Sequence, residues 1–227
     1  MGIATRLRNL CMGALLRGHF IASGPRGEKV IAITFDDGPI PVHTAAILDL
    51  LGANGACATF FLTGSHAESH PELVRRIADE GHELANHSYK HVAFARMPLA
   101  NQLDEIERVD ALLQARDGRE LHWFRPPQGI MPPSLLVALM RRRHPVAMWS
   151  LDSLDYLGSG VQAILQRFES RPARNGEIVL FHDDNDGTVQ ALRALLPLWR
   201  DDGFRFATVS ELAGGTPSSR ERQRGSP

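Results

Sequence analysis

The sequence contains only two cysteines, Cys11 and Cys57, in 227 residues. So few cysteines exclude the disulfide framework that stabilises many small secreted domains, and they favour a reducing compartment. The formal net charge at pH 7 is −1, so the chain lacks the basic surplus typical of proteins that bind nucleic acid or anionic membranes. No apolar run approaches the roughly 20 residues of a membrane-spanning helix. The composition, 43% hydrophobic and 22% charged, is that of an ordinary globular protein.

Both ends of the chain lack the features of a folded domain. In the N-terminal segment, residues 1–28, the apolar stretch 10–16 stops at Arg17, whereas a secretory signal needs about 7–15 uninterrupted apolar residues. We therefore expect a cytoplasmic protein, and an amphipathic contact of this segment with a membrane surface stays open. Residues 214–227 contain no apolar side chain and predict a disordered tail. The folded catalytic domain is expected over residues 29–213.

Two periodicities alternate along this domain. Short apolar or β-branched runs predict strands at 30–35, 58–63, 83–86, 121–125, 146–151, 177–181 and 204–209. Helical spacing occurs between them, at 43–53, 70–80, 99–115, 133–143, 160–170, 188–200 and 210–213. Such alternation indicates βαβ units and a mostly parallel sheet. We predict an α/β fold, an irregular (β/α) barrel with about seven parallel strands; an open, doubly wound sheet is the alternative.

Ionisable residues gather where the predicted strands end. The strand ends carry Asp36–Asp37, Asn86–His87, Arg125–Pro126, Asp152 with Asp155, and His182–Asp183. In parallel α/β barrels the active site is built at this end of the strands, from residues of several of them. Although they are far apart in the sequence, these residues are therefore expected to converge on one face.

The stretch NHSYKH contains two histidines, His87 and His91, four residues apart. A helical turn or a compact loop would let both imidazoles reach one point. Two histidines and one carboxylate are a common ligand set of catalytic zinc, whose fourth position is left to water. The alternative for such a pair is one histidine in the core and one on the surface. Together with the paired aspartates, the pattern favours a metal site.

Five motifs then identify a family resemblance. TFDDGP (34–39), HSYKH (87–91), RPPQG (125–129), DSLDY (152–156) and IVLFHD (178–183) resemble, in order, the motifs of the polysaccharide deacetylases, the NodB-homology enzymes of carbohydrate esterase family four. The resemblance covers essentially the whole predicted domain. It implies the same irregular barrel and a metal-dependent hydrolysis of an N-acyl amino sugar.

The resemblance also implies roles for individual residues. Asp36 would be the general base, held by Arg125, and His182 the general acid. Asp37, His87 and His91 would bind one divalent ion, with Zn²⁺ as the first choice. Asp155 would raise the pKa of His182 and keep it charged, and Asp152 is the fallback for that role.

The substrate groove departs from the family pattern at two positions. The family has an aromatic residue, most often tyrosine, where this chain has Gln128, and tryptophan where it has Tyr156. The main-chain N–H near Gln128 is an expected oxyanion donor, Pro127 and Tyr156 would line the groove, and Leu180 would face the acetyl methyl. These departures predict a preference for a small or lipid-linked amino sugar over long polymers.

Several residues receive no functional role at this point. Asp183, Asp184 and Asp186 are read as solvated loop charges. The histidines without a role are His43, His66, His70, His82, His122 and His144.

The leading hypothesis is a deacylase that removes an N-acetyl or N-formyl group from an amino sugar in an oligosaccharide, polysaccharide or glycolipid. Strand-end aspartates and histidines also build two-metal phosphohydrolases, which need more ligands at one place. A carbohydrate-binding homologue without turnover is the third possibility, suggested by Gln128 and Tyr156. The oligomeric state cannot be read from the sequence.

Overall fold

Strand β2 (Val30–Asp36) forms the centre of the sheet in this computed structural model, which describes residues 19–214. All seven residues of the strand are buried, as expected for a parallel strand covered on both faces. It pairs in parallel with β7 (Glu177–His182) on one side. On the other side it pairs with β8 (Arg205–Phe206) at its start and with β3 (Ala58–Leu62) further along. This arrangement leaves the carboxyl end of β2 between those of β3 and β7.

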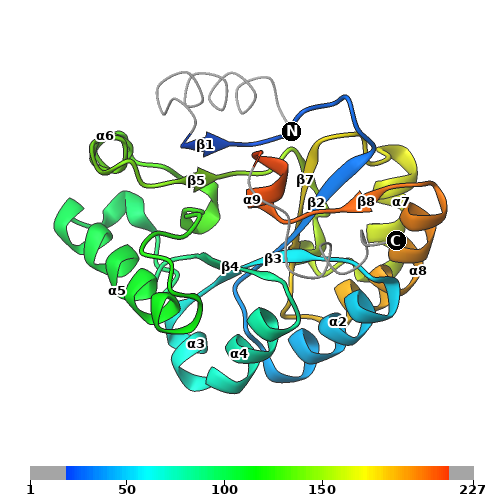
Figure 1. The fold of residues 1–227 in the computed structure, drawn as a ribbon, viewed down its shortest axis with the longest axis horizontal. Coiled ribbons are helices and arrows are strands. Elements are labelled where there is room, and N and C mark those ends of the chain that lie inside the picture. The colour runs from blue at the N-terminus through cyan, green and yellow to red at the C-terminus, as the bar shows by residue number, and fades with distance from the viewer. Residues whose placement is uncertain (1–18, 215–227) are drawn as a thin grey trace, which may run out of the picture.

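Parallel pairing continues around a barrel. β3 pairs with β4 (Glu83–Asn86), and β6 (Leu151–Asp152) pairs with β7. Phe124 bridges β4 to β5 (Val146–Ala147). The segment from β5 to β6 completes the circuit, which confirms the irregular (β/α) barrel. Figure 1 shows the strands at the centre of the ribbon.

Three predicted strands are much shorter in the structure. The strand expected at 204–209 is limited to the two residues of β8, because a helix begins at Val209. The strand expected at 121–125 is reduced to single bridges at Phe124, because Pro126 and Pro127 follow at once and supply no amide donor. The strand expected at 146–151 is split into β5 and β6. Its first part pairs with Phe124 and with β1 (Phe20–Ile21), and its last part with β7. One segment therefore changes neighbours along its length, and this makes the barrel irregular.

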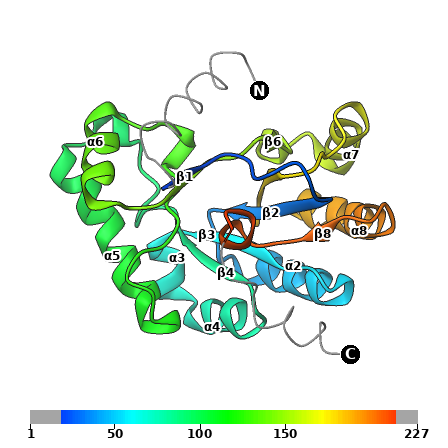
Figure 2. The same cartoon turned by 45° about the horizontal axis from the view of Figure 1, so that its top comes forward.

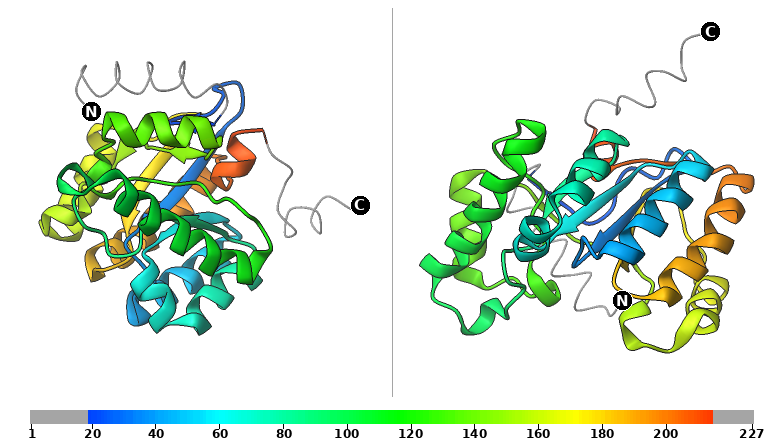
Figure 3. Two further views of the ribbon diagram at one scale, coloured as in Figure 1. Left: turned by 90° about the vertical axis from the view of Figure 1, so that its left-hand side faces the viewer. Right: turned by 90° about the horizontal axis from the view of Figure 1, so that it is seen from below.

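Helices α2 to α8 form the outer layer, as Figures 2 and 3 show from other sides. The bounds of the helices are α2 Pro41–Asn54, α3 Gly64–Ser69, α4 Pro71–Asp79, α5 Leu99–Asp117, α6 Pro133–Arg142, α7 Gly160–Ser170, α8 Asp186–Asp201 and α9 Val209–Leu212. The short α9 lies among the strands instead, where Val209 and Leu212 pack in the same cluster as Ala32. Short 3-10 turns lie at Phe94–Arg96, Pro127–Gly129 and Asp155–Leu157. α3 was not predicted, because its sequence GSHAES has too few apolar residues to show a helical period.

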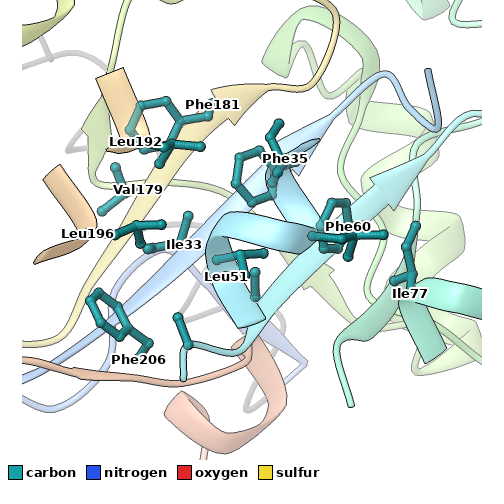
Figure 4. Packing of buried hydrophobic residues seen from close by; sticks show 14 of the residues in the cluster. Ile33, Phe35, Leu51, Phe60, Ile77, Val179, Phe181, Leu192, Leu196 and Phe206 are labelled. Atoms are coloured by element: carbon teal, nitrogen blue, oxygen red, sulfur yellow. The ribbon is translucent and has the colours of Figure 1, made fainter. Parts of the chain in front are cut away.

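The alternating side chains of β2 separate the core into two parts. Ile31, Ile33 and Phe35 point outward into the large cluster beneath the helices, where Phe35 stacks on Phe60 at 4.9 Å between ring centroids (Figure 4). Ala32 belongs to a smaller cluster with residues of the other strands. Burial of each large apolar side chain contributes about 1.5–3 kcal/mol. The same alternation places Asp36 on the side of Ala32.

The chain ends differ from expectation in one respect. β1 pairs in parallel with β5, so the strand pairing begins upstream of the domain start predicted at residue 29. Residues 1–18 and the predicted tail from residue 215 lie outside the described residues. Within the described part of the chain, no helix has the length and apolar character needed to cross a membrane.

Candidate active site

The two aspartates at the end of β2 both approach His87 but differ in burial and in their other partners. Asp36 is buried, whereas Asp37 is partly exposed and has a positive φ of 80°. The Oδ1 of Asp37 lies 3.3 Å from Nε2 of His91 and 3.5 Å from Nε2 of His87. The possible ligand atoms of these three residues all lie within 4.8 Å of one another. Asp36 Oδ2 also lies 3.7 Å from Nε2 of His87. Both carboxylates therefore approach His87, and Asp37 also approaches His91.

This cluster has the properties of a cation site. Asp37 Oδ1 is buried and accepts no hydrogen bond within the described residues. The Nδ1 of His87 lies 2.8 Å from the carbonyl oxygen of Arg125, so it carries the proton and leaves the Nε2 lone pair facing Asp37. Burial lowers the pKa of His87 to about 3, which keeps this imidazole neutral. Two imidazoles and one carboxylate fit the ligand preference of zinc.

Arg125 is fully buried beside Asp36. Its Nη1 donates to Asp36 Oδ1 at 2.6 Å and to Thr34 Oγ1 at 2.9 Å. The guanidinium carbon lies 3.8 Å from the centroid of the Phe61 ring. Burial raises the pKa of Asp36, and the positive charge of Arg125 opposes this rise. Arg125 therefore favours the ionised carboxylate, as expected, but it does not outweigh the desolvation of Asp36.

A second carboxylate–histidine pair lies at the end of β7. The Nδ1 of His182 is 2.8 Å from Asp155 Oδ1, and the main-chain N–H of His182 donates to Asp155 Oδ2 at 2.7 Å. Thr188 also donates to Oδ2 at 2.7 Å. Burial opposes the charged imidazole, but Asp155 and the aspartates of β2 raise the pKa of His182 to about 9. The fallback partner, Asp152, instead accepts from the N–H of Leu154 at 2.9 Å.

The predicted groove residues occupy two environments. Leu180 and Pro127 are buried, Leu180 on the inward-facing side of β7 with His182. Gln128 is exposed and has a φ of 56°. The Tyr156 side chain is 54% exposed, and its ring lies edge-on to His182 at 5.5 Å between centroids. Tyr156 is therefore free to meet a ligand above the imidazole.

One sequence interpretation is wrong. Asp183, predicted to be a solvated loop charge, is 0% exposed, because it lies under α2 and the loop that follows β2. Burial raises its pKa to about 7. Asp184 and Asp186 are exposed, as predicted.

Two supporting groups around the ligands were missed from the sequence. His66 of α3 lies with its Nδ1 2.8 Å from the carbonyl oxygen of Asp37. Asp110 of α5 accepts from Asn86 Nδ2 at 3.0 Å, and Asn86 Oδ1 in turn accepts from the N–H of Ser88 at 3.0 Å. The spacing of apolar residues placed Asp110 in a predicted helix. No feature of the sequence indicated that this helix contacts the HSYKH loop.

Comparisons with known proteins identify the family. The family model for polysaccharide deacetylase matches residues 23–142. A peptidoglycan-N-acetylglucosamine deacetylase of Bacillus cereus is 38% identical over 208 residues, 86% of this chain and 93% of that protein. A chitooligosaccharide deacetylase of Sinorhizobium fredii is 34% identical over 201 residues, 82% of this chain and 92% of its own. The chain belongs to the polysaccharide deacetylase family and is a hydrolase of the amino-sugar amide bond.

Solved structures give the same fold. A peptidoglycan N-acetylglucosamine deacetylase in complex with a naphthalenyl N-oxidanyl-benzamide superposes with a TM-score of 0.82 at 30% identity, over 88% of this chain and 94% of that chain. The peptidoglycan deacetylase PdaC from Bacillus subtilis gives a TM-score of 0.77 at 32% identity, over 88% and 95%. A mutant of a family pseudoenzyme, with restored enzymatic activity, also has this fold, with a TM-score of 0.78 at 26% identity, over 86% of this chain and 71% of that chain.

Proposed function

We propose that the protein is a metal-dependent deacetylase that removes the N-acetyl group from an amino sugar within an oligosaccharide, peptidoglycan fragment or glycolipid. The observation that carries the proposal is the ligand cluster of Asp37, His87 and His91 beside the buried Asp36–Arg125 pair. The Asp155–His182 pair lies at the end of the neighbouring strand. The cluster of Asp37, His87 and His91 suits a cation. Asp36 suits a general base, and His182 suits a general acid.

Asp37, His87 and His91 would hold one divalent ion, zinc being the first choice for this donor set. When bound, such an ion lowers the pKa of a water molecule and polarises a carbonyl oxygen. Asp36 accepts the proton of the attacking water, because Arg125 orients its carboxylate and favours its charge. The main-chain N–H near Gln128 is proposed as a further donor to the developing oxyanion.

His182 delivers the proton to the departing amine. Its pKa of about 9 keeps the imidazole charged at neutral pH, and Asp155 fixes the ring by its bond to Nδ1. The Nε2 proton is then the one available to the substrate. Leu180, buried on the same side of β7, provides an apolar contact for the acetyl methyl.

The substrate class rests on the relatives and on the groove. Relatives are named for peptidoglycan N-acetylglucosamine and for chitooligosaccharides, so an N-acetyl amino sugar is the common feature. Tyr156 offers an exposed aromatic ring beside His182, on which one sugar ring can stack. Gln128 supplies no second aromatic platform, which favours a short or lipid-linked acceptor over a long polymer. Removal of an N-formyl group, and the cytoplasmic location, stay predictions.

The test is acetate release from N-acetylated chitooligosaccharides and peptidoglycan fragments, with formate release measured in parallel on formylated sugars. We expect acetate release to stop after chelation, to return with zinc, and to be lost in Asp36→Asn. Activity that survives both chelation and Asp36→Asn contradicts the mechanism. Sugar binding without release across the panel would instead indicate an inactive homologue. Two bound ions per chain would indicate the phosphohydrolase alternative.

A further inference from the structure

Asp183 follows His182 directly in the sequence but contacts a different part of the molecule. Thr44, in the first turn of α2, donates its hydroxyl proton to Asp183 Oδ2. The N–H of Ile40 donates to the same Thr44 oxygen at 2.7 Å. An amide N–H only donates, so the Thr44 oxygen accepts from Ile40 and leaves its own proton for Asp183. The hydrogen bonds run from Ile40 through Thr44 to Asp183.

The loop between β2 and α2 also lies directly on the Asp183 carboxylate. A Cβ atom on Gly38 would lie 2.1 Å from Asp183 Oδ2 and 2.5 Å from Oδ1. No side chain fits at that distance, so glycine is required here by the close approach. Asp183 therefore supports the loop at two points, by contact at Gly38 and through Thr44 at Ile40.

Asp37 is the residue that this loop presents to the histidines. Its φ of 80° is a conformation that costs a non-glycine residue about 1–3 kcal/mol and persists only when the surroundings enforce it. The carbonyl of Asp37 accepts from Thr63 Oγ1 at 3.1 Å and from His66 Nδ1 at 2.8 Å. The N–H of Thr63 also donates to the Gly38 carbonyl at 3.0 Å. These bonds hold one side of the loop, and Asp183 contacts its other side at Gly38 and, through Thr44, at Ile40.

We propose that Asp183 is a positioning residue, which holds residues 37–40 so that the Asp37 carboxylate faces His87 and His91. It acts through Gly38 and Thr44. The inference rests on the proposed metal centre for its effect on zinc, but the geometry of the loop is independent of any ion.

Zinc affinity, measured by competition with a chromophoric chelator, is the first test. Asp183→Ala and Thr44→Val should each weaken zinc binding by about 10- to 100-fold, the usual effect of removing a group that orients a ligand. Asp183→Asn keeps an oxygen that accepts from Thr44 and should bind zinc nearly as the wild type does.

Thr59→Val is the matched control. Its buried hydroxyl bonds Glu83 at 2.8 Å and the N–H of Val209 at 2.9 Å, near the start of the strands.

Amide hydrogen exchange at Ile40 is the second test and needs no metal. Thr44→Val removes the acceptor of this N–H, so we expect faster exchange in that variant and in Asp183→Ala, and no change in Thr59→Val. Unchanged exchange and unchanged zinc affinity in folded Thr44→Val overturn the proposal. An equal loss of zinc in Thr59→Val also overturns it, because general destabilisation would then be the cause. If the wild type binds no zinc, the proposed metal centre fails, and Ile40 exchange alone decides whether Asp183 holds the loop.

Discussion

Asp155 receives two hydrogen bonds from His182, one from the imidazole Nδ1 at 2.8 Å and one from the main-chain N–H at 2.7 Å. The carboxylate thereby fixes both the ring orientation and the tautomer of this histidine. With its pKa raised to about 9, His182 is charged below that pH. A proton donor that is charged at neutral pH suits the release of an amine.

Asp155→Asn should remove the negative charge that stabilises the protonated imidazole of His182. We expect the pKa of His182 to fall from about 9 toward its ordinary value near 6.5. At pH 8 such a fall lowers the protonated fraction by about 30-fold, and the basic limb of kcat/KM should move to lower pH. NMR titration of the His182 ring and a pH–rate profile check this. Asp184→Asn, at an exposed neighbouring position, is the control; an unchanged His182 pKa in Asp155→Asn would contradict the assignment.

The adjacent aspartates should separate metal binding from turnover. Asp37→Ala removes a ligand atom, so zinc affinity should fall by more than about 100-fold. Asp36→Asn leaves the three proposed ligands in place and removes the proposed base, so zinc should stay bound while turnover falls by about 10²- to 10⁴-fold. Equilibrium dialysis with zinc and acetate release measure the two effects. Equal loss of zinc in both variants would show that Asp36 is itself a ligand.

The buried Arg125–Asp36 pair should be costly to break. Arg125→Met leaves the Asp36 carboxylate buried without its partner, since both side chains are almost fully buried. We expect a loss of about 3–5 kcal/mol in the free energy of unfolding. The double variant with Asp36→Asn should recover part of that loss, because no uncompensated charge remains.

Urea unfolding followed by circular dichroism measures these losses. Arg142→Met breaks an exposed ion pair with Glu107 and should cost less than about 1 kcal/mol. If the double variant is no more stable than Arg125→Met alone, an unpaired Asp36 charge is not the cause of the loss.

Much of this site can be predicted from the sequence, because its residues stand at the ends of apolar strands or at a regular spacing. Asp36 ends a seven-residue apolar strand, His87 and His91 share a four-residue spacing, and His182 ends a second apolar strand. Strand alternation and the convergence of parallel strand ends bring such residues together. The barrel followed from the same alternation of strands and helices.

The residues that were missed act across long sequence separations. Asp183 is 139 residues from Thr44, and Asp110 is 24 residues from Asn86. Neither pair has a local spacing that a sequence pattern detects. The positive φ of Asp37 was equally hidden, because aspartate gives less indication of this conformation than glycine does. The strand predicted at 121–125 contains Phe124 but is too long, because Phe124 alone of these residues forms bridges to its neighbours.

His122 is expected to make stability depend on pH. Its ring lies between two carboxylates, with Nδ1 3.2 Å from Asp110 Oδ1 and Nε2 3.1 Å from Asp117 Oδ1. Burial lowers its pKa, but the two carboxylates outweigh this and raise it above its usual value. The charged imidazole therefore contributes stability that is fully present below its unfolded pKa and is lost as the pH rises through its folded pKa.

His122→Gln should consequently cost more at pH 6 than at pH 9. At pH 6 Asp110 and Asp117, whose pKa values are lowered despite burial, are ionised. The variant then loses bonds between charged groups, worth about 1.5–3 kcal/mol. At pH 9 the wild type has lost part of this contribution, so the difference between the two proteins should shrink. Urea unfolding at both pH values measures this difference in stability. His70→Gln, at a more exposed position, is the control and should change stability by less than about 0.5 kcal/mol. A cost for His122→Gln that is equal at pH 6 and pH 9 would show that folding does not shift the pKa of His122, and a smaller cost at pH 6 would show that folding lowers it.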